Sequence, residues 1–118
     1  MKVNDYFEFD DEHPIPNLDV VDINTVKTNG GSDLFVIVAT PLADDPRSLK
    51  RLLRKIERYL EFLNSEEFLA QSGPPTTANT NIIVKLHPES SRAAFELVER
   101  SRERVISNNA NLVIDMQV

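Results

Sequence analysis

Apolar side chains recur at the spacing of an α-helix in residues 46–63, PRSLKRLLRKIERYLEFL. At about 100° per residue they fall within one arc of about 120°, which predicts a strongly amphipathic helix that runs to about Asn64. The apolar positions on this arc are Leu49, Leu52, Leu53, Ile56, Tyr59, Leu60 and Leu63. Asp45 is a suitable N-cap, and Pro46 suits the first helical position, where its missing N–H is not needed.

A second helix is predicted for residues 89–107, after Pro88. Its apolar positions are Ala94, Phe95, Val98, Val105 and Ile106. Arg102 falls in the middle of this apolar arc, so its side chain must extend past the core edge to water, pair with a carboxylate or serve a site. We favour the first interpretation, because long cationic side chains commonly extend in this way.

The remaining apolar runs have the length and composition of β-strands. The glycine pair in TNGGSD predicts a hairpin with strands at about 18–27 and 34–40. NIIVKLH predicts a strand at 81–87, and LVIDMQV predicts the last strand at 112–118. These last two runs alternate between apolar and polar positions, so only one face of each strand is suited to a core. LFVIVA is apolar throughout and is therefore predicted to be central.

The predicted order of elements is β-β-α-β-α-β. Both β-α-β connections are expected to be right-handed parallel crossovers, and the hairpin adds an antiparallel neighbour. The sequence thus predicts a two-layer sandwich of the α/β or α+β class, with a four-stranded mixed sheet and both helices on one face. Residues 18–118 would form this single domain. Residues 1–17, which are acidic and contain two prolines, are predicted to be a flexible arm.

Charge changes this picture because it is unevenly distributed. Residues 1–45 carry two Lys and ten acidic residues, residues 46–60 carry six basic residues and one Glu, and residues 61–118 carry five basic and eight acidic residues. The formal net charge is -6, which argues against a nucleic-acid partner. The sequence contains no cysteine and no long apolar run, which predicts a cytoplasmic protein without disulfides or a membrane span.

The basic residues of the first helix lie opposite its apolar arc. This basic face consists of Arg47, Arg51, Arg54 and Arg58, flanked by Lys50 and Lys55. A solvated surface is the simplest interpretation. Cations near a helix N-terminus are disfavoured by the helix dipole, however. The acidic side chains of the arm, Asp10, Asp11 and Glu12, are therefore the partners that we expect for the basic face, either in the same chain or in a second copy.

The sequence assigns no catalytic residue, metal site or cofactor, because no metal-binding, nucleophile or phosphate-loop motif is present. Lys85, His87 and Asp115 form a candidate site at the uncovered sheet face, near the ends of strands where α/β proteins often place sites. An ordinary polar residue is the simpler interpretation of His87. Enzyme activity therefore has no support from the sequence.

The uncovered sheet face is predicted to be half apolar. The side chains expected on it are Val20, Asp22, Val26, Ile83, Val113 and Asp115. Such a face is either a wet surface or a surface for self-association. We regard it as the best candidate for a homodimer interface.

Several stretches carry a resemblance to known proteins. They are VVDIN, the glycine turn, the apolar strand after it, KIERYLEFLNSEEF, NIIVKLHPES and the closing Asn-rich turn with its strand. Over about residues 18–118 the chain resembles a family of small bacterial proteins of unknown function, and KIERYLEFLNSEEF is the most specific piece. The resemblance implies a bacterial origin and a compact α/β domain, and it implies no activity. Residues 1–17 lie outside it.

These features predict a non-enzymatic bacterial protein that binds another protein, a second copy of itself included. One alternative is an immunity protein or antitoxin that neutralises a basic toxin, which the net charge of -6 would suit. Another is a small enzyme or ligand-binding domain that uses the open sheet face near Lys85, His87 and Asp115.

Overall fold

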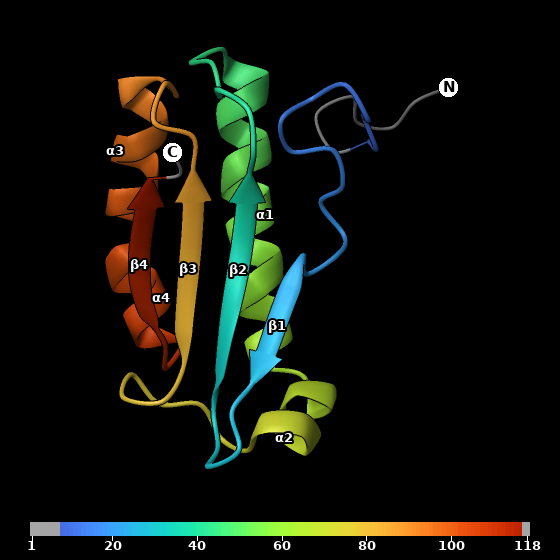
Figure 1. The fold of residues 1–118 in the computed structure, drawn as a ribbon, viewed down its shortest axis with the longest axis vertical. Coiled ribbons are helices and arrows are strands. Elements are labelled where there is room, and N and C mark those ends of the chain that lie inside the picture. The colour runs from blue at the N-terminus through green and yellow to red at the C-terminus, as the bar shows by residue number, and fades with distance from the viewer. Residues whose placement is uncertain (1–7, 117–118) are drawn as a thin grey trace.

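The computed structural model describes residues 8–116 and contains one four-stranded mixed sheet. Its strands are β1 (Ile23–Val26), β2 (Ser32–Val38), β3 (Asn81–Leu86) and β4 (Asn111–Met116), in the spatial order β1-β2-β3-β4. β1 pairs with β2 antiparallel, whereas β2, β3 and β4 are parallel to one another. The predicted α+β class and mixed sheet are confirmed (Figure 1).

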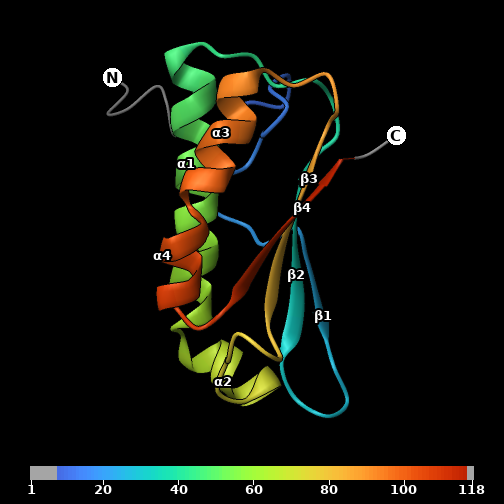
Figure 2. The ribbon, with the colours of Figure 1, turned by 90° about the vertical axis from the view of Figure 1, so that its left-hand side faces the viewer.

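Four helical segments accompany the sheet. They are α1 (Pro46–Leu63), α2 (Glu66–Ser72), α3 (Arg92–Arg100) and α4 (Arg102–Ser107). Figure 2 shows α1, α3 and α4 as one layer beside the sheet, with the opposite sheet face turned away from them. No helix among the described residues combines the length and the apolar character that a membrane span requires.

α1 begins and ends as its sequence predicts. The Asp45 carboxylate accepts a hydrogen bond from the Ser48 N–H at 3.1 Å, and Pro46 occupies the first turn. This cap satisfies one of the amide groups that a helix N-terminus leaves without an internal partner. At the other end, Asn64 is the C-cap, and its main-chain N–H donates to the carbonyls of Glu61 and Phe62.

The second predicted helix is divided. Ser91 is its N-cap, with the hydroxyl accepting from the Ala94 N–H at 3.2 Å, so the helix starts later than the predicted residue 89. At Ser101 the hydroxyl donates back to the Leu97 carbonyl at 2.9 Å, and α3 ends there. The single helix over residues 89–107 was therefore wrong, because serine side chains that bond to the main chain compete with continuous helix.

The core lies between the sheet and the helix layer. Its strand residues are Leu34, Val36, Val38, Ile82, Val84, Leu86 and Leu112, each at most 2% exposed. Phe35 and Ile83, which point to the other face, are only partly buried. The period-two pattern of the sequence therefore gave the correct buried face for these strands.

The hairpin is shorter than predicted. Its turn requires glycine at position 31, where φ is +84° and an added Cβ would lie 2.1 Å from the Asn79 carbonyl oxygen. β1 comprises Ile23–Val26 only, although the sequence predicted a strand over 18–27. The preceding residues leave the sheet and run along α1 instead (Figure 1).

The arm is integrated with the domain from residue 8 onward. Ile15 and Leu18 are 1% and 4% exposed and belong to the same core cluster. The predicted boundary at residue 17 therefore does not divide the core. The mobility predicted for residues 1–17 stays a prediction, and residues 1–7 lie outside the described part of the chain.

Candidate binding surfaces

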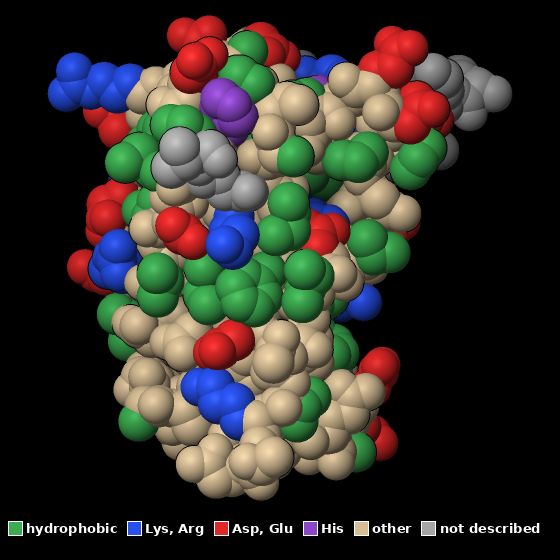
Figure 3. Space-filling view, viewed as in Figure 1, with side chains coloured by type: hydrophobic (Ala, Val, Ile, Leu, Met, Phe, Trp, Pro, Cys, Tyr) green, Lys and Arg blue, Asp and Glu red, His purple; other side chains and the backbone are tan. Residues whose placement is uncertain are grey.

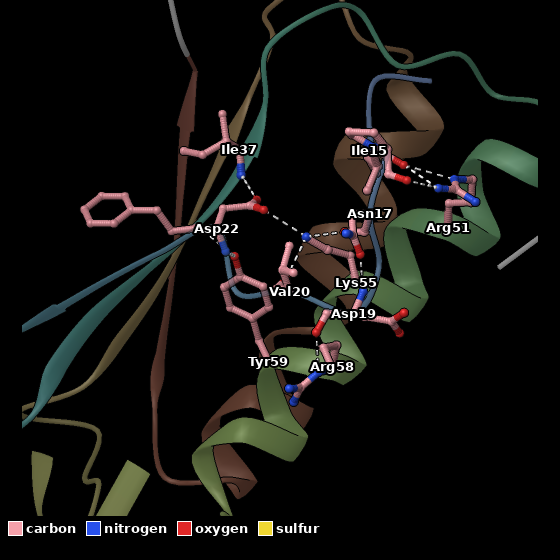
Figure 4. Close-up of polar contacts among 12 residues, drawn as sticks. Ile15, Asn17, Asp19, Val20, Asp22, Ile37, Arg51, Lys55, Arg58 and Tyr59 are labelled. Atoms are coloured by element: carbon pink, nitrogen blue, oxygen red, sulfur yellow. Dashed lines mark hydrogen bonds and ion pairs between the residues drawn. The ribbon is translucent and has the colours of Figure 1, made fainter. Parts of the chain in front are cut away.

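The arm meets the basic face of α1 mainly through main-chain carbonyl groups (Figure 4). Arg51 is fully buried, and its guanidinium donates to the carbonyl oxygens of Ile15 at 2.6 and 3.1 Å, Pro16 at 3.0 Å and Glu8 at 2.7 Å. These carbonyls belong to irregular chain that has no strand neighbour to bond with. Arg51 thus supplies the donors that a sheet would otherwise provide.

Lys55 holds the next part of the arm and is only 2% exposed. Its ammonium donates to the carbonyls of Asn17 and Val20 at 2.5 and 2.8 Å, and it forms an ion pair with Asp22 at 2.9 Å. All three donors of the ammonium group are used. The second Asp22 oxygen accepts the Ile37 N–H at 3.0 Å, so this carboxylate joins the helix to the edge of β2.

The basic face is therefore not one uniform surface. Arg47 pairs with the Asp10 carboxylate of the arm at 2.9 Å, and Arg58 donates to the Asp19 carbonyl at 2.9 Å. Arg54 pairs with Glu61 on its own helix at 3.0 Å. A solvated surface is wrong for Arg51, because the arm covers it.

In the helical pattern of the sequence, Lys55 only flanks the basic face. It nevertheless became one of the most buried charges, because residues 17–22 leave the sheet and present carbonyl groups to it. The early Pro14 and Pro16 indicated irregular chain, but no sequence pattern locates where such a segment docks.

Arg51, Asp10 and His13 have shifted pKa values at this contact. Burial lowers the pKa of Arg51, and the positive charge of Arg47 lowers it further. The hydrogen bond from Arg47 lowers the pKa of Asp10. Burial, followed by the charges of Arg51 and Arg47, lowers the pKa of His13.

His13 connects the arm to the start of α1. Its Nδ1 accepts the Ile15 N–H at 2.9 Å, which requires that nitrogen to be unprotonated. Its Nε2 lies 3.0 Å from the hydroxyl of Ser48, a buried residue of the first turn. The neutral ring therefore fits this position, whereas a protonated ring would lose the Ile15 contact.

The uncovered sheet face carries one continuous apolar row. The strand register aligns Ile23 with Phe35, Phe35 with Ile83, and Ile83 with Val113. These four side chains, one from each strand, are named the apolar row below. Figure 3 shows hydrophobic side chains as a band across the middle of this face.

Polar side chains flank the apolar row on both sides. Towards the carboxyl ends of the strands, Lys85 pairs with Asp115 at 3.1 Å, and its ammonium lies 5.8 Å from the centre of the Phe35 ring. Towards the amino ends of the parallel strands, Asp33 accepts from the Asn81 amide at 2.8 Å and pairs with Lys27 at 3.3 Å. The charges on this face thus neutralise one another.

Two of the side chains predicted for the open face, Val20 and Val26, lie elsewhere. Val26 pairs with Ser32, whose side chain is buried, so Val26 lies on the helix side of β1. Val20 precedes β1 and lines a groove together with Val26. The prediction gave even-numbered residues of this strand to the open face, whereas the pairing with β2 puts Ile23 and Thr25 there, and a shift of one residue exchanges the two faces.

Asp22 was also predicted for the open face and is instead bound to Lys55. Of the candidate site, Lys85 and Asp115 contact each other on this face, while His87 follows β3 and accepts the Glu89 N–H through Nδ1 at 3.0 Å. The structure gives no contact between His87 and the ion pair.

Arg102 forms two contacts with Glu99, at 2.6 and 3.0 Å, and donates to the Leu112 carbonyl at 2.7 Å. Among its predicted roles, pairing with a carboxylate is thus the one found. The contact lowers the pKa of Glu99 and raises that of Arg102. Within residues 8–116, no group of three or more acidic or histidine side chains is arranged to hold a metal ion.

The fold and these surfaces define a small α+β domain with one uncovered sheet face and a docked N-terminal arm. Comparisons with protein-family models, curated proteins and solved structures found no match to this chain.

Proposed function

We propose that this protein is a non-enzymatic protein-binding domain that associates with a second copy of itself through the uncovered sheet face. The apolar row is the observation that carries the proposal. Ile23 and Val113 are 48% and 37% exposed, although aliphatic side chains of this size are commonly buried. A second copy would remove this row from water.

The charge of the face favours self-association over the alternatives. Each molecule carries a formal net charge of -6, which opposes the approach of two copies. On the sheet face, however, Lys85 is paired with Asp115 and Lys27 with Asp33. Two such faces can therefore meet without strong repulsion. A toxin-neutralising protein would be expected to present a predominantly acidic face to a basic partner.

The size of the face indicates a weak dimer. Strands about 4.8 Å apart, with about six residues of about 3.3 Å each, give a four-stranded face of roughly 400 Å². A standard stable interface uses about 800 Å² on each partner. We therefore expect a dimer that dissociates on dilution.

A small enzyme or ligand-binding domain at Lys85, His87 and Asp115 is the runner-up. The Lys85 ammonium and the Asp115 carboxylate are already paired at 3.1 Å, and a substrate would have to separate them. The resemblance noted above supports a bacterial origin, and the absence of a cysteine supports a cytoplasmic location. The bacterial origin and the cytoplasmic location are therefore parts of the proposal.

Replacing Val113 with Lys tests the self-association. The new charge would be desolvated within the interface without a partner, which is costly. Sedimentation velocity over a concentration series should show a reversible dimer for the native chain and a monomer for Val113→Lys.

The matched control is Ile106→Lys, which adds the same charge at a side chain that is 45% exposed on α4. It should dimerise like the native chain, because α4 lies in the helix layer (Figure 2). A native chain that stays monomeric at every concentration contradicts the proposal, and so does equal dimerisation of the Val113→Lys variant.

A further inference from the structure

The two edges of the sheet end in different ways. At the β4 edge, the Arg102 guanidinium donates to the Leu112 carbonyl and also holds Glu99. This side chain occupies a main-chain acceptor and places charge where another strand would approach, which is a common protection of sheet edges. β1 forms the opposite edge (Figure 1). Its residues Asn24 and Val26 line a groove.

This groove has a volume of about 610 Å³ and is bounded by the arm, β1, α1 and α2. Its apolar lining consists of Val20, Val21, Val26 and Phe62. Val20 and Val26 are 45% and 43% exposed. The groove thus offers apolar surface directly beside the free edge of a strand.

Asn24 provides an independent observation at the same place. Its Oδ1 is buried, and among residues 8–116 it is the buried side-chain polar atom for which no hydrogen-bond partner is found. Its Nδ2 has one long contact, 3.4 Å to Gln71 Oε1. Buried polar atoms are normally paired. The amide of Asn24 is therefore able to turn towards a chain that enters the groove.

The charge of the groove selects the kind of chain. Asp19 and Glu67 line it with exposed carboxylates, whereas its one lining cation, Arg58, already donates to the Asp19 carbonyl. A second copy added through β1 by two-fold symmetry would bring the same carboxylates near one another. A basic foreign chain would instead complement them.

We propose that β1 and this groove bind an extended peptide that combines apolar and basic residues and adds to the sheet as a fifth strand. The main chain of the peptide would bond to the free edge of β1. Because side chains alternate along a strand, every second peptide residue would point into the groove. There, apolar residues would contact Val20 and Val26, and basic ones would reach Asp19 and Glu67. This proposal does not depend on self-association.

The probe is the blocked peptide KTVTVTK, whose lysines and valines share one face. Titrated into isotope-labelled protein up to about 1 mM, where weak complexes saturate, it should shift the amide resonances of residues 19–26 and 66–72 in a saturable way. The charge-reversed peptide ETVTVTE should bind at least about tenfold more weakly. The peptide KTVPVTK should also bind more weakly, because proline removes a main-chain donor.

Asp19→Lys combined with Glu67→Lys should weaken KTVTVTK binding about tenfold or more. The control variant, Glu96→Lys combined with Glu103→Lys, makes the same charge change on exposed positions of the helix layer and should bind normally. All of these side chains are exposed, so the amide spectrum should otherwise keep its dispersion.

Equal binding of ETVTVTE and KTVTVTK overturns the proposal, as do shifts that map away from β1 or no shift at all. If residues 19–21 and 66–72, which lie outside the apolar row, respond to protein concentration without any peptide, the groove accepts a second copy, and the proposal of a foreign peptide is wrong.

Discussion

The side chain of Arg51 carries a full charge into the interior, where the arm surrounds it with carbonyl groups. Hydrogen bonds from a charged donor are worth more than neutral ones, and their loss leaves buried acceptors without donors. The contacts of Arg51 with main-chain carbonyl groups therefore hold the arm more strongly than the surface ion pair of Arg47 with Asp10 does.

Replacing Arg51 with Leu should therefore lower the free energy of unfolding by about 2–4 kcal/mol. The matched control is Arg54→Leu on the same helix, since Arg54 forms an exposed pair with Glu61. That variant should lose less than about 1 kcal/mol. Urea unfolding of both variants measures the difference. Equal losses would show that the buried contacts of Arg51 with the arm contribute nothing beyond those of an exposed pair.

Sequence reasoning located these residues without giving their environment. Arg51 and Arg54 share the polar side of one helical pattern, so the pattern treats them alike. The difference between the two arginines comes from residues 8–22, which are distant in sequence. These residues cover Arg51 and do not cover Arg54. Helical periodicity describes an element by itself, and it contains no information on irregular chain that docks later.

At the scale of elements, the arm and the start of α1 form one titratable contact at His13. Because the pKa of His13 is lowered on folding, the neutral ring is favoured in the folded state. The contribution of His13 to the free energy of unfolding is complete above the pKa of about 6.5 that it has in the unfolded chain. This contribution is lost as the pH falls through the lower pKa of the folded state. Arg51 and Arg47 oppose protonation, while Asp10 and Asp45 favour it more weakly.

Acidification from about pH 7.5 to 5 should therefore lower the urea midpoint of unfolding. In His13→Gln, which cannot titrate, this part of the pH dependence should disappear. His87→Gln removes the other histidine of the chain and should keep the native pH dependence. If the pH dependence of the urea midpoint were instead lost only in His87→Gln, the titrating group would be His87, and the role given to His13 would be wrong.

The elements themselves show which sequence signals are reliable. The cap at Asp45 and the long apolar arc after it gave α1 within a residue, because both signals are local. Ser101 interrupts the second predicted helix, although the apolar spacing continues through it. At β1 the β-branched composition continued to residue 18, but Asp22 bonds to Lys55 and takes the chain out of the sheet.

At the scale of the whole molecule, the sheet is covered by helices on one side (Figure 2). It carries the apolar row on the other side. The period-two patterns of β3 and β4 predicted Ile83 and Val113 for this face. They could not predict Ile23 and Phe35 as their neighbours, because pairing across strands depends on register. The apolar row exists only once the four strands are aligned.

The most direct test of the central claim is an isotope-filtered NOE experiment on a mixture of labelled and unlabelled protein. Contacts between copies should join the methyl groups of Ile23, Ile83 and Val113 to the Phe35 ring of the other copy. They should vanish in Val113→Lys at the same concentration. Intermolecular contacts that map to the helix layer, or a diffusion coefficient independent of concentration up to about 1 mM, would contradict self-association through the sheet face.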